Sequence, residues 1–375
     1  MKTKAAIISG VGEDWKICEI DLADPVVGEV QVRLVASGLC HSDEHLVSGA
    51  SPAAFFPILG GHEGAGVVTK VGPGVLGFEP GDHVVLAFIP ACGTCRACAS
   101  GLQNLCDQGA GLLSGRAISD GTYRVTMDGN PVLPMCLLGT FAPYVTVNQA
   151  SVVKIEKDIP LDKAALLGCG VSTGWGSAVE IGNTRPGDTV VVIGVGGVGI
   201  NAVQGAKHAG ARFVVAVDPV EFKREKALEF GATHAFSSIE DARGALPDLT
   251  WGQMANTTIL TVGDIEGEHI QQALNLTAKA GQVVVTAMGG HGESKVELNL
   301  SMLTLLQQRI QGAIFGGTGP RSSIPKLLSL YRTGDLKLDE LVTRTYRLED
   351  INQGYRDMLD GKNLRGVIKY SDADY

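Results

Sequence analysis

Four cysteines lie close together in the chain, and their spacing is that of a metal-binding loop. Cys92, Cys95, Cys98 and Cys106 follow the pattern Cys-x2-Cys-x2-Cys-x7-Cys, in a segment with glycines and few apolar residues. Four thiolates at this spacing can surround one zinc ion tetrahedrally and leave no coordination position open. Such an ion would fasten the loop and do no chemistry. An iron–sulfur cluster and a disulfide-linked loop are the two alternatives.

Three further short segments each contain a potential metal ligand beside a glycine or a turn. They are Cys40-His41-Ser42-Asp43 followed by His45, then Gly61-His62-Glu63, and then Gly168-Cys169-Gly170. Singly these are weak signals, because a lone cysteine such as Cys169 is usually a small apolar core residue. Together they offer two thiols and three imidazoles, and a set of two thiols with one imidazole would leave one position of a zinc ion open to substrate.

A glycine-rich turn is the second chemical signal. The run Gly194-Val195-Gly196-Gly197-Val198-Gly199 follows an apolar segment, opens a helical one, and precedes Asp218 at the end of the next apolar run. In this pattern Gly194 permits the turn, Gly196 lets the backbone approach a pyrophosphate, and Gly199 allows close packing of helix on strand. Asp218 is placed to accept hydrogen bonds from ribose hydroxyls and to repel a 2′-phosphate, which favours NAD over NADP. The alternative is a turn without a ligand, in a chain with 50 glycines among 375 residues.

The elements that must position these groups fall into two patterns. Residues 1 to about 170 contain short β-like runs between Gly and Pro turns, which predicts an irregular β-rich module. From residue 189 onward strands and helices alternate, which predicts a doubly wound parallel sheet in an α/β fold. The predicted strands are 29–35, 66–71, 83–88, 142–147, 189–193, 213–217, 257–262, 282–286 and 367–370. The predicted helices are 197–209, 222–230, 266–280, 302–307, 323–333 and 348–360.

The overall composition limits the function classes. Hydrophobic residues make up 45% and charged residues 19% of the chain, as in a packed globular protein. A net charge of −9 without a Lys/Arg run argues against a nucleic-acid partner. No signal peptide is apparent and no apolar run reaches the ~18 residues of a membrane span, so we expect a cytoplasmic protein with no membrane partner. In that compartment eight cysteines favour metal binding over disulfides.

These motifs, with residues 60–68 (GGHEGAGVV) and 79–84 (EPGDHV), resemble those of the zinc-dependent medium-chain alcohol dehydrogenases. The resemblance runs from about residue 4 to residue 370. It implies a GroES-like catalytic domain at residues 1–172 and 314–375 and a Rossmann domain at residues 173–313. It also implies NAD and two zinc ions per chain, one catalytic and one structural. The implied catalytic ligands are Cys40, His62 and Cys169, and the structural ligands are Cys92, Cys95, Cys98 and Cys106.

The resemblance also assigns roles around the catalytic zinc ion. The ion lowers the pKa of the alcohol so that hydride can leave its carbon for the nicotinamide. In the family the proton leaves through a hydroxyl, the cofactor ribose and a surface histidine, and Ser42 and His45 match the two side-chain positions. Asp43 and Glu63 match carboxylates behind the ligands, with Asp43 orienting His62. The alternatives are an exposed histidine and solvated surface acids.

Other positions match the dinucleotide contacts of the family. Those near the ribose and the phosphates are Thr173, Lys223 and Arg365. Gly197 and Val198, in the glycine-rich turn, are also expected to contact the cofactor. Those at the strand end beside the nicotinamide are Thr286, Ala287 and Met288. His41 stands where many relatives carry an arginine for the pyrophosphate, which alters the charge near the phosphates.

Two segments indicate a particular branch of the alcohol dehydrogenase family. Residues 218–224 (DPVEFKR) and 251–256 (WGQMAN) resemble the nitrosoaniline-dependent nicotinoprotein branch, whose members retain NAD and reduce an external acceptor. We therefore expect His41 and residues 251–256 to border the dinucleotide and to favour its retention. The partners implied are a small alcohol or aldehyde, an external redox acceptor and further copies of the chain in a homo-oligomer. The alternatives are an NAD-exchanging alcohol dehydrogenase, a thiol-dependent formaldehyde dehydrogenase and a zinc-free protein without activity.

Overall fold

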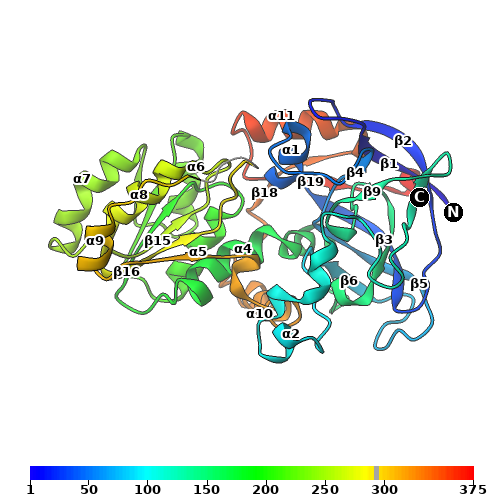
Figure 1. Cartoon of the computed structure of the whole chain (residues 1–375), viewed down its shortest axis with the longest axis horizontal. Helices are drawn as coiled ribbons and strands as arrows, with labels where there is room; N and C mark the ends of the chain where they lie inside the picture. The colour runs from blue at the N-terminus through cyan, green and yellow to red at the C-terminus, as the bar shows by residue number, and fades with distance from the viewer. Residues whose placement is uncertain (291–294) are drawn as a thin grey trace. The chain divides into compact units, whose positions relative to one another are not determined.

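The computed structural model describes residues 1–290 and 295–375, which form two compact units (Figure 1). The first unit comprises Met1–Cys169, Gly319–Thr333 and Leu338–Tyr375, and the second comprises Gly170–Thr318 and Gly334–Lys337. The predicted domain boundaries were at 172/173 and 313/314, a few residues from the observed ones, and residues 334–337 were predicted to belong to the catalytic domain. That short segment joins the second unit through Lys337, whose backbone N–H donates to Gln204 Oε1 at 2.8 Å and whose Nζ donates to the Glu229 carbonyl at 2.7 Å.

The first unit is built on two sheets. The strands of one are β1 (Lys2–Ile8), β2 (Lys16–Leu22), β4 (Ile58–Leu59), β7 (Val125–Met127), β8 (Asn130–Pro131) and β9 (Leu133–Pro134), in the order β8-β7-β2-β1-β4-β9. The strands of the other are β3 (Glu29–Gly38), β5 (Gly64–Val71), β6 (His83–Leu86), β10 (Tyr144–Asn148), β11 (Val152–Ile155), β18 (Val342–Tyr346) and β19 (Arg365–Lys369). Their order is β11-β6-β5-β3-β19-β18, and β10 also pairs with β3. The helices of this unit are α1 (His41–Ser48), α2 (Arg96–Ala99), α3 (Leu161–Ala164), α10 (Pro320–Thr333) and α11 (Ile351–Leu359).

The second unit contains a parallel sheet. Its strands are β12 (Thr189–Ile193), β13 (Phe213–Val217), β14 (His234–Phe236), β15 (Ala255–Leu260), β16 (Thr277–Val285) and β17 (Arg309–Gly312), in the order β14-β13-β12-β15-β16-β17. Its helices are α4 (Gly170–Gly176), α5 (Gly199–His208), α6 (Glu221–Glu229), α7 (Ile239–Thr250), α8 (Gly267–Leu276) and α9 (Leu300–Leu305). Every residue of β12 is buried, as expected for a central parallel strand covered on both faces. The predicted fold class, a β-rich GroES-like part and a Rossmann sheet, is confirmed.

The structure corrects several element predictions. The helix predicted at 266–280 ends at Leu276, because Thr277 is extended and pairs with Ala255 as the first residue of β16. A β-branched residue favours this extended conformation. In the second unit α4, β14, α7 and β17 were not predicted, and in the first unit β1, β2, α1, β11, β18 and several shorter elements were also missed. None of the helices in the described ranges is long and apolar enough to cross a membrane.

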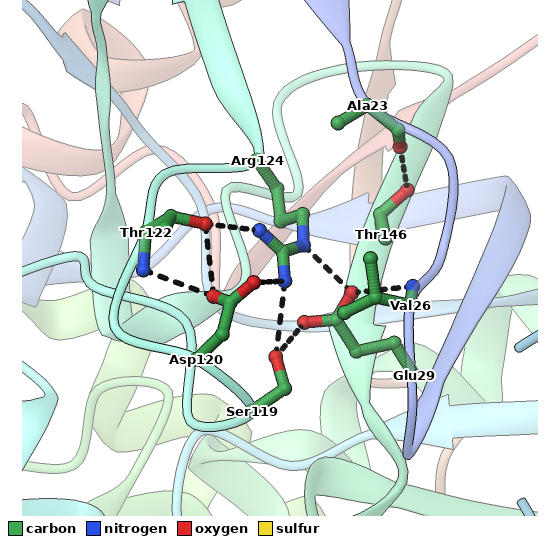
Figure 2. Close-up of polar contacts among 8 residues, drawn as sticks. All are labelled: Ala23, Val26, Glu29, Ser119, Asp120, Thr122, Arg124 and Thr146. Carbon is green, nitrogen blue, oxygen red and sulfur yellow. Dashed lines mark hydrogen bonds and ion pairs between the residues drawn. The ribbon is translucent and has the colours of Figure 1, made fainter. Parts of the chain in front are cut away.

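A buried ion pair fastens the loop before β7 to the start of β3 (Figure 2). Arg124 Nε donates to Glu29 Oε2 at 2.7 Å, and both side chains are buried. The same carboxylate accepts hydrogen bonds from the Val26 backbone N–H at 3.1 Å and from the Ser119 hydroxyl. The guanidinium also donates to Asp120 at 2.9 Å. A buried charge pair is stable only when its other polar atoms are also bonded, and this cluster meets that condition.

Candidate functional site

The four clustered cysteines converge on one point. Their sulfur atoms all lie within 4.8 Å of one another. The Sγ atoms of Cys92 and Cys98 are 3.9 Å apart, as are those of Cys95 and Cys106. Zn–S bonds of about 2.3 Å in a tetrahedron place sulfurs about 3.8 Å apart, so the spacing fits a four-thiolate zinc ion.

The backbone around this cluster favours thiolates. Backbone N–H groups of Thr94 and Cys95 point at Cys92 Sγ at 3.4 and 3.3 Å, and the Cys98 N–H points at Cys95 Sγ at 3.4 Å. Burial alone would raise the pKa of Cys92, but the hydrogen bonds from Cys95 and Thr94 lower it to about 6. Burial raises the pKa of Cys106 to about 12. The donor set therefore fits a zinc ion that has no open position.

A second buried cluster brings together the other three predicted ligands. Cys40 lies between β3 and α1, His62 precedes β5, and Cys169 precedes α4. Their ligand atoms, with a carboxylate oxygen of Glu63, lie within 4.8 Å of one another. Two thiols and an imidazole fit a zinc ion that keeps a position for substrate. Glycine is required on both sides of the cluster, since a Cβ at Gly61 would lie 2.5 Å from Thr140 Oγ1 and one at Gly168 would lie 2.2 Å from the Leu86 carbonyl oxygen.

The three predicted ligands of this cluster differ in their tendency to carry charge. A hydrogen bond from Cys169 lowers the pKa of Cys40 well below its usual value, and the same bond raises the pKa of Cys169. Burial would lower the pKa of His62, but the charges of Asp43 and Cys40 raise it well above the usual value. The negative charge of this cluster therefore lies on Cys40 and on the neighbouring Asp43, and a divalent cation would be attracted to it.

Asp43 and Glu63 have different partners. Asp43 Oδ2 lies 3.2 Å from His62 Nδ1, and Oδ1 accepts a hydrogen bond from the Gly61 N–H at 2.7 Å. Glu63 is fully buried and forms an ion pair with Arg365, which also donates to the Leu39 carbonyl at 3.1 Å. The resemblance placed Arg365 near the ribose and phosphates of the cofactor, and its guanidinium forms an ion pair with Glu63 inside the first unit. Its contact with a cofactor stays a prediction.

His41, Ser42 and His45 lie on or beside the first turn of α1. Ser42 Oγ is 3.7 Å from Cys40 Sγ. The ring centroids of His41 and His45 are 4.9 Å apart in an edge-on arrangement, because residues four apart share one helix face. The sequence predicted a surface position for His45, but its side chain is only 5% exposed. The ring of His41 packs against it.

In the second unit the glycine loop has the predicted geometry. Gly194 has a φ of +85°, and a Cβ there would lie 2.8 Å from the Val262 nitrogen. A Cβ at Gly199 would lie 1.9 Å from the Gly194 carbonyl oxygen, so the helix could not pack this closely with any other residue. Nothing lies within 4 Å of the Cβ position at Gly196, which leaves room for a pyrophosphate. Gly197 and Val198 lead directly into α5.

Asp218 anchors this loop. Its Oδ2 accepts a hydrogen bond from the Val195 N–H at 3.0 Å, and its Oδ1 accepts one from the Val220 N–H at 3.0 Å. Each oxygen retains a lone pair for a ribose hydroxyl. Arg224 donates to the Asp218 carbonyl at 2.9 Å, and the contact of Lys223 with a cofactor stays a prediction. The loop and this carboxylate therefore fit a dinucleotide.

The residues at the end of β16 are joined to α4 by a serine that the sequence analysis missed. The Ser177 hydroxyl lies 2.8 Å from Thr286 Oγ1 and donates to the Thr173 carbonyl at 2.7 Å. The Thr173 hydroxyl itself is buried and makes no hydrogen bond to a described residue. The N–H groups of Thr286 and Ala287 both donate to the Leu260 carbonyl, and Met288 is exposed. The fixed Thr286 and the unpaired Thr173 hydroxyl suit a ligand with amide or hydroxyl groups.

One prediction about the dinucleotide is wrong. Residues 251–256 lead into the start of β15, whereas the glycine loop follows the end of β12. The two strands are parallel, with Val190 opposite Thr257 and Ile193 opposite Leu260. Residues 251–256 therefore lie at the end of the sheet opposite the glycine loop, where Asn256 Oδ1 accepts the Thr189 N–H at 2.8 Å. They do not border the dinucleotide site.

Comparison with known families identifies the class of protein. The alcohol dehydrogenase GroES-like domain matches residues 27–157, and the zinc-binding dehydrogenase domain matches residues 197–333. The chain belongs to the zinc-dependent medium-chain alcohol dehydrogenases, as its sequence predicted, and is a zinc-dependent dehydrogenase.

Individual proteins similar to this chain indicate the branch of the family. Alcohol dehydrogenase B of Mycobacterium tuberculosis is 55% identical over 374 residues, and the alignment covers 100% of both chains. The NDMA-dependent alcohol dehydrogenase of Amycolatopsis methanolica is 52% identical over 371 residues, covering 99% of this chain and 100% of the relative. Among solved structures, an alcohol dehydrogenase zinc-binding domain protein from Burkholderia ambifaria has a TM-score of 0.92 at 34% identity, covering 99% of each chain. The predicted likeness to the nitrosoaniline-dependent branch is confirmed.

Proposed function

We propose that this enzyme oxidises small alcohols to aldehydes, with a catalytic zinc ion on Cys40, His62 and Cys169 and with NAD as the hydride acceptor. The observation that carries the proposal is the buried set of two thiols and one imidazole, whose ligand atoms lie within 4.8 Å. Three protein ligands leave one position for substrate, whereas four thiolates leave none. The four-cysteine cluster would hold the second, structural ion.

The chain's own groups would orient the ligands and move the proton. When bound, the catalytic zinc ion would act as a Lewis acid and lower the pKa of the alcohol hydroxyl. Ser42, whose hydroxyl lies 3.7 Å from Cys40 Sγ, is placed to receive that proton, and His45 on the same helix is placed to pass it on. Asp43 orients the His62 ring, and Arg365 neutralises Glu63 behind the ligands.

We further infer that NAD stays bound between turnovers and is reoxidised in place by an external acceptor. The 52% identity to an NDMA-dependent alcohol dehydrogenase supports this inference. Residues 251–256 do not support the inference, because they lie at the end of the parallel sheet opposite the glycine loop. The glycine loop, Asp218 and Thr173 would hold the cofactor, and retention lengthens about tenfold for each ~1.4 kcal/mol added to the release barrier.

Native mass spectrometry and an acceptor assay test these proposals together. After extensive desalting we expect two zinc ions and one NAD per chain, and oxidation of ethanol or a longer alcohol by a nitrosoaniline acceptor without added NAD. Cys98→Ser should lose one zinc ion and stability, whereas Cys169→Ser should lose one zinc ion and activity but stay folded. One zinc ion per chain in active enzyme would refute the ligand assignment. Activity only with added NAD, from protein without retained nicotinamide, would instead indicate an NAD-exchanging enzyme.

A thiol-dependent formaldehyde dehydrogenase, the alternative function, is tested by a separate activity assay. An S-(hydroxymethyl)glutathione dehydrogenase of Paracoccus denitrificans is 35% identical to this chain, well below the 52% of the NDMA-dependent relative. Activity with formaldehyde that requires a thiol carrier, and exceeds activity with free alcohols, would favour that function.

We also infer that the chain forms a homo-oligomer through β17. This strand ends the parallel sheet, and all four of its residues are exposed. Large apolar side chains are exposed on it and close to it in sequence, namely Leu300, Leu305, Ile310 and Ile314. A monomer usually protects such an edge with charge or a covering element, and a second copy can cover it by strand pairing.

A further inference from the structure

A buried tyrosine lies beside the carboxylate that orients His62. The hydroxyl of Tyr355, on α11, is buried and makes no hydrogen bond of normal geometry within the described residues. Oδ2 of Asp43 is also buried, and its contact is the 3.2 Å approach of His62 Nδ1. Burial raises the pKa of Tyr355 well above its usual value, and among the surrounding charges that of Asp43 contributes most. A buried donor and a buried acceptor, each without a hydrogen bond of normal geometry, thus lie in the same part of the first unit and close enough to interact electrostatically.

Two other rings fix the position of the phenol. Trp15 stacks on Tyr355 with centroids 5.9 Å apart, and Phe141 lies 6.3 Å from Tyr355 and 5.4 Å from Trp15. Trp15 is itself tied to α11, because its backbone N–H and carbonyl bond the Asn352 side chain at 2.9 Å each. The Tyr355 ring therefore has little freedom to turn its hydroxyl elsewhere.

The same rings enclose the turn that delivers His62. A Cβ at Gly60 would lie 2.3 Å from the Trp15 ring, and one at Gly61 would lie 2.6 Å from the Phe141 ring. The Phe141 N–H donates to the Gly60 carbonyl at 2.9 Å. On its other side the turn is bonded to Asp43 through the Gly61 N–H at 2.7 Å. The aromatic cluster and Asp43 hold this backbone between them.

We propose that Tyr355 is a positioning residue for the zinc ligand His62, acting as a hydrogen-bond donor to Asp43. The inference rests on the proposed catalytic zinc site. A carboxylate that receives donors from Gly61, His62 and Tyr355 cannot rotate freely, so it keeps the proton on His62 Nδ1 and leaves Nε2 for the metal. Tyr355 touches neither metal nor substrate and acts through Asp43 alone.

The first test measures how fast each zinc ion is lost to a coloured chelator. Tyr355→Phe keeps the ring and removes the hydroxyl, so folding and thermal stability should change little. Removing a direct partner of a metal ligand costs about 10- to 100-fold in metal affinity, and we expect about a 3- to 10-fold faster loss of the catalytic ion for this more distant group. The structural ion, on the four cysteines, should leave at an unchanged rate. Tyr346→Phe is the matched control, since its hydroxyl donates to another buried aspartate, Asp357, at 2.8 Å.

A double-mutant cycle then asks whether the effect passes through Asp43. Asp43→Asn should accelerate loss of the catalytic ion more than Tyr355→Phe does, and adding Tyr355→Phe to it should have little further effect. Equal rates for Tyr355→Phe and Tyr346→Phe, or independent effects in the double variant, would overturn the inference. The zinc content of the unaltered enzyme is measured first. Fewer than two ions per chain overturns both the site and this inference, whereas two ions with unchanged release rates overturn this inference alone.

Discussion

Asp218 combines a structural contact with the proposed recognition of the ribose. One oxygen anchors the glycine loop through Val195 and the other caps the following turn through Val220, each at 3.0 Å. The carboxylate is thereby held with a fixed orientation at the end of β13. A 2′-phosphate placed beside it would meet a like charge, with Arg224 turned toward backbone carbonyl oxygens.

Asp218→Gly should therefore weaken binding of NAD and improve the relative binding of NADP. Hydrogen bonds to charged groups contribute about 1.5–3 kcal/mol, so we expect the ratio of the two dissociation constants to shift by about tenfold or more. The measurement uses protein stripped of its cofactor and refilled by titration. Asp218→Asn serves as the comparison because it keeps an acceptor and removes only the charge. If the ratio stays unchanged in both variants, the ribose is recognised elsewhere.

For single residues, the sequence was informative where only a few residue types can do the chemistry, as in metal binding. Cys40, His62 and Cys169 are far apart in the chain and were predicted as one site, and their ligand atoms lie within 4.8 Å. Contacts made by common residue types could not be predicted. The pairing of Arg365 with Glu63 and the bond between Ser177 and Thr286 depend on how distant elements pack, which no local pattern encodes.

Among the elements, the loop before β7 depends most visibly on charge (Figure 2). Asp120 accepts hydrogen bonds from Arg124 at 2.9 Å and from the Thr122 N–H at 3.0 Å. The hydrogen bond from Arg124, followed by that of Thr122, lowers the pKa of Asp120 to about 2. Since this folded-state pKa lies below the unfolded value of about 3.9, the carboxylate stabilises the fold above about pH 4. That contribution is lost as the pH falls toward 2.

Asp120→Asn should therefore lower the unfolding temperature at pH 6, and the difference from the unaltered protein should shrink under acid. From the two pKa values, about half of the difference should remain at pH 3. Asp120 is partly exposed, so salt should reduce the effect. Scanning calorimetry between pH 6 and pH 3 measures it, with Asp372→Asn at an exposed carboxylate as control. A difference that stays constant across this range would show that Asp120 acts through packing rather than charge.

Element type was easier to predict than element ends and directions. The alternation of apolar runs from residue 189 predicted the parallel sheet, because buried parallel strands need such runs. Residues 251–256 were misplaced because the resemblance, and not the strand direction, was used to place them. They precede the predicted strand 257–262, whereas the glycine loop follows strand 189–193, and the parallel pairing of β12 with β15 puts the two loops at opposite ends of the sheet.

At the scale of the whole molecule, the exposed β17 edge sets the expected assembly. Ile310→Lys places a charge on this strand and should weaken self-association by about tenfold or more, because an inward charge blocks edge pairing. Sedimentation velocity over a range of protein concentrations measures the change. Leu76→Lys replaces another exposed leucine-sized side chain, in the first unit, and should leave the assembly unchanged. An unaltered protein that is monomeric at all concentrations would contradict the proposed interface.

The three tryptophans give the protein a built-in set of optical reporters. Trp251 is 73% exposed, held in a left-handed conformation after α7 with Arg212 over its ring, whereas Trp15 and Trp175 are buried. A soluble quencher should reach Trp251 in the native protein and leave the other two emitting. With Trp251 replaced by phenylalanine, the remaining fluorescence would come from Trp15, beside the turn that delivers His62, and from Trp175, in the helix that follows Cys169. Changes near the Cys40–His62–Cys169 cluster and in the second unit could then be followed by fluorescence without an added label.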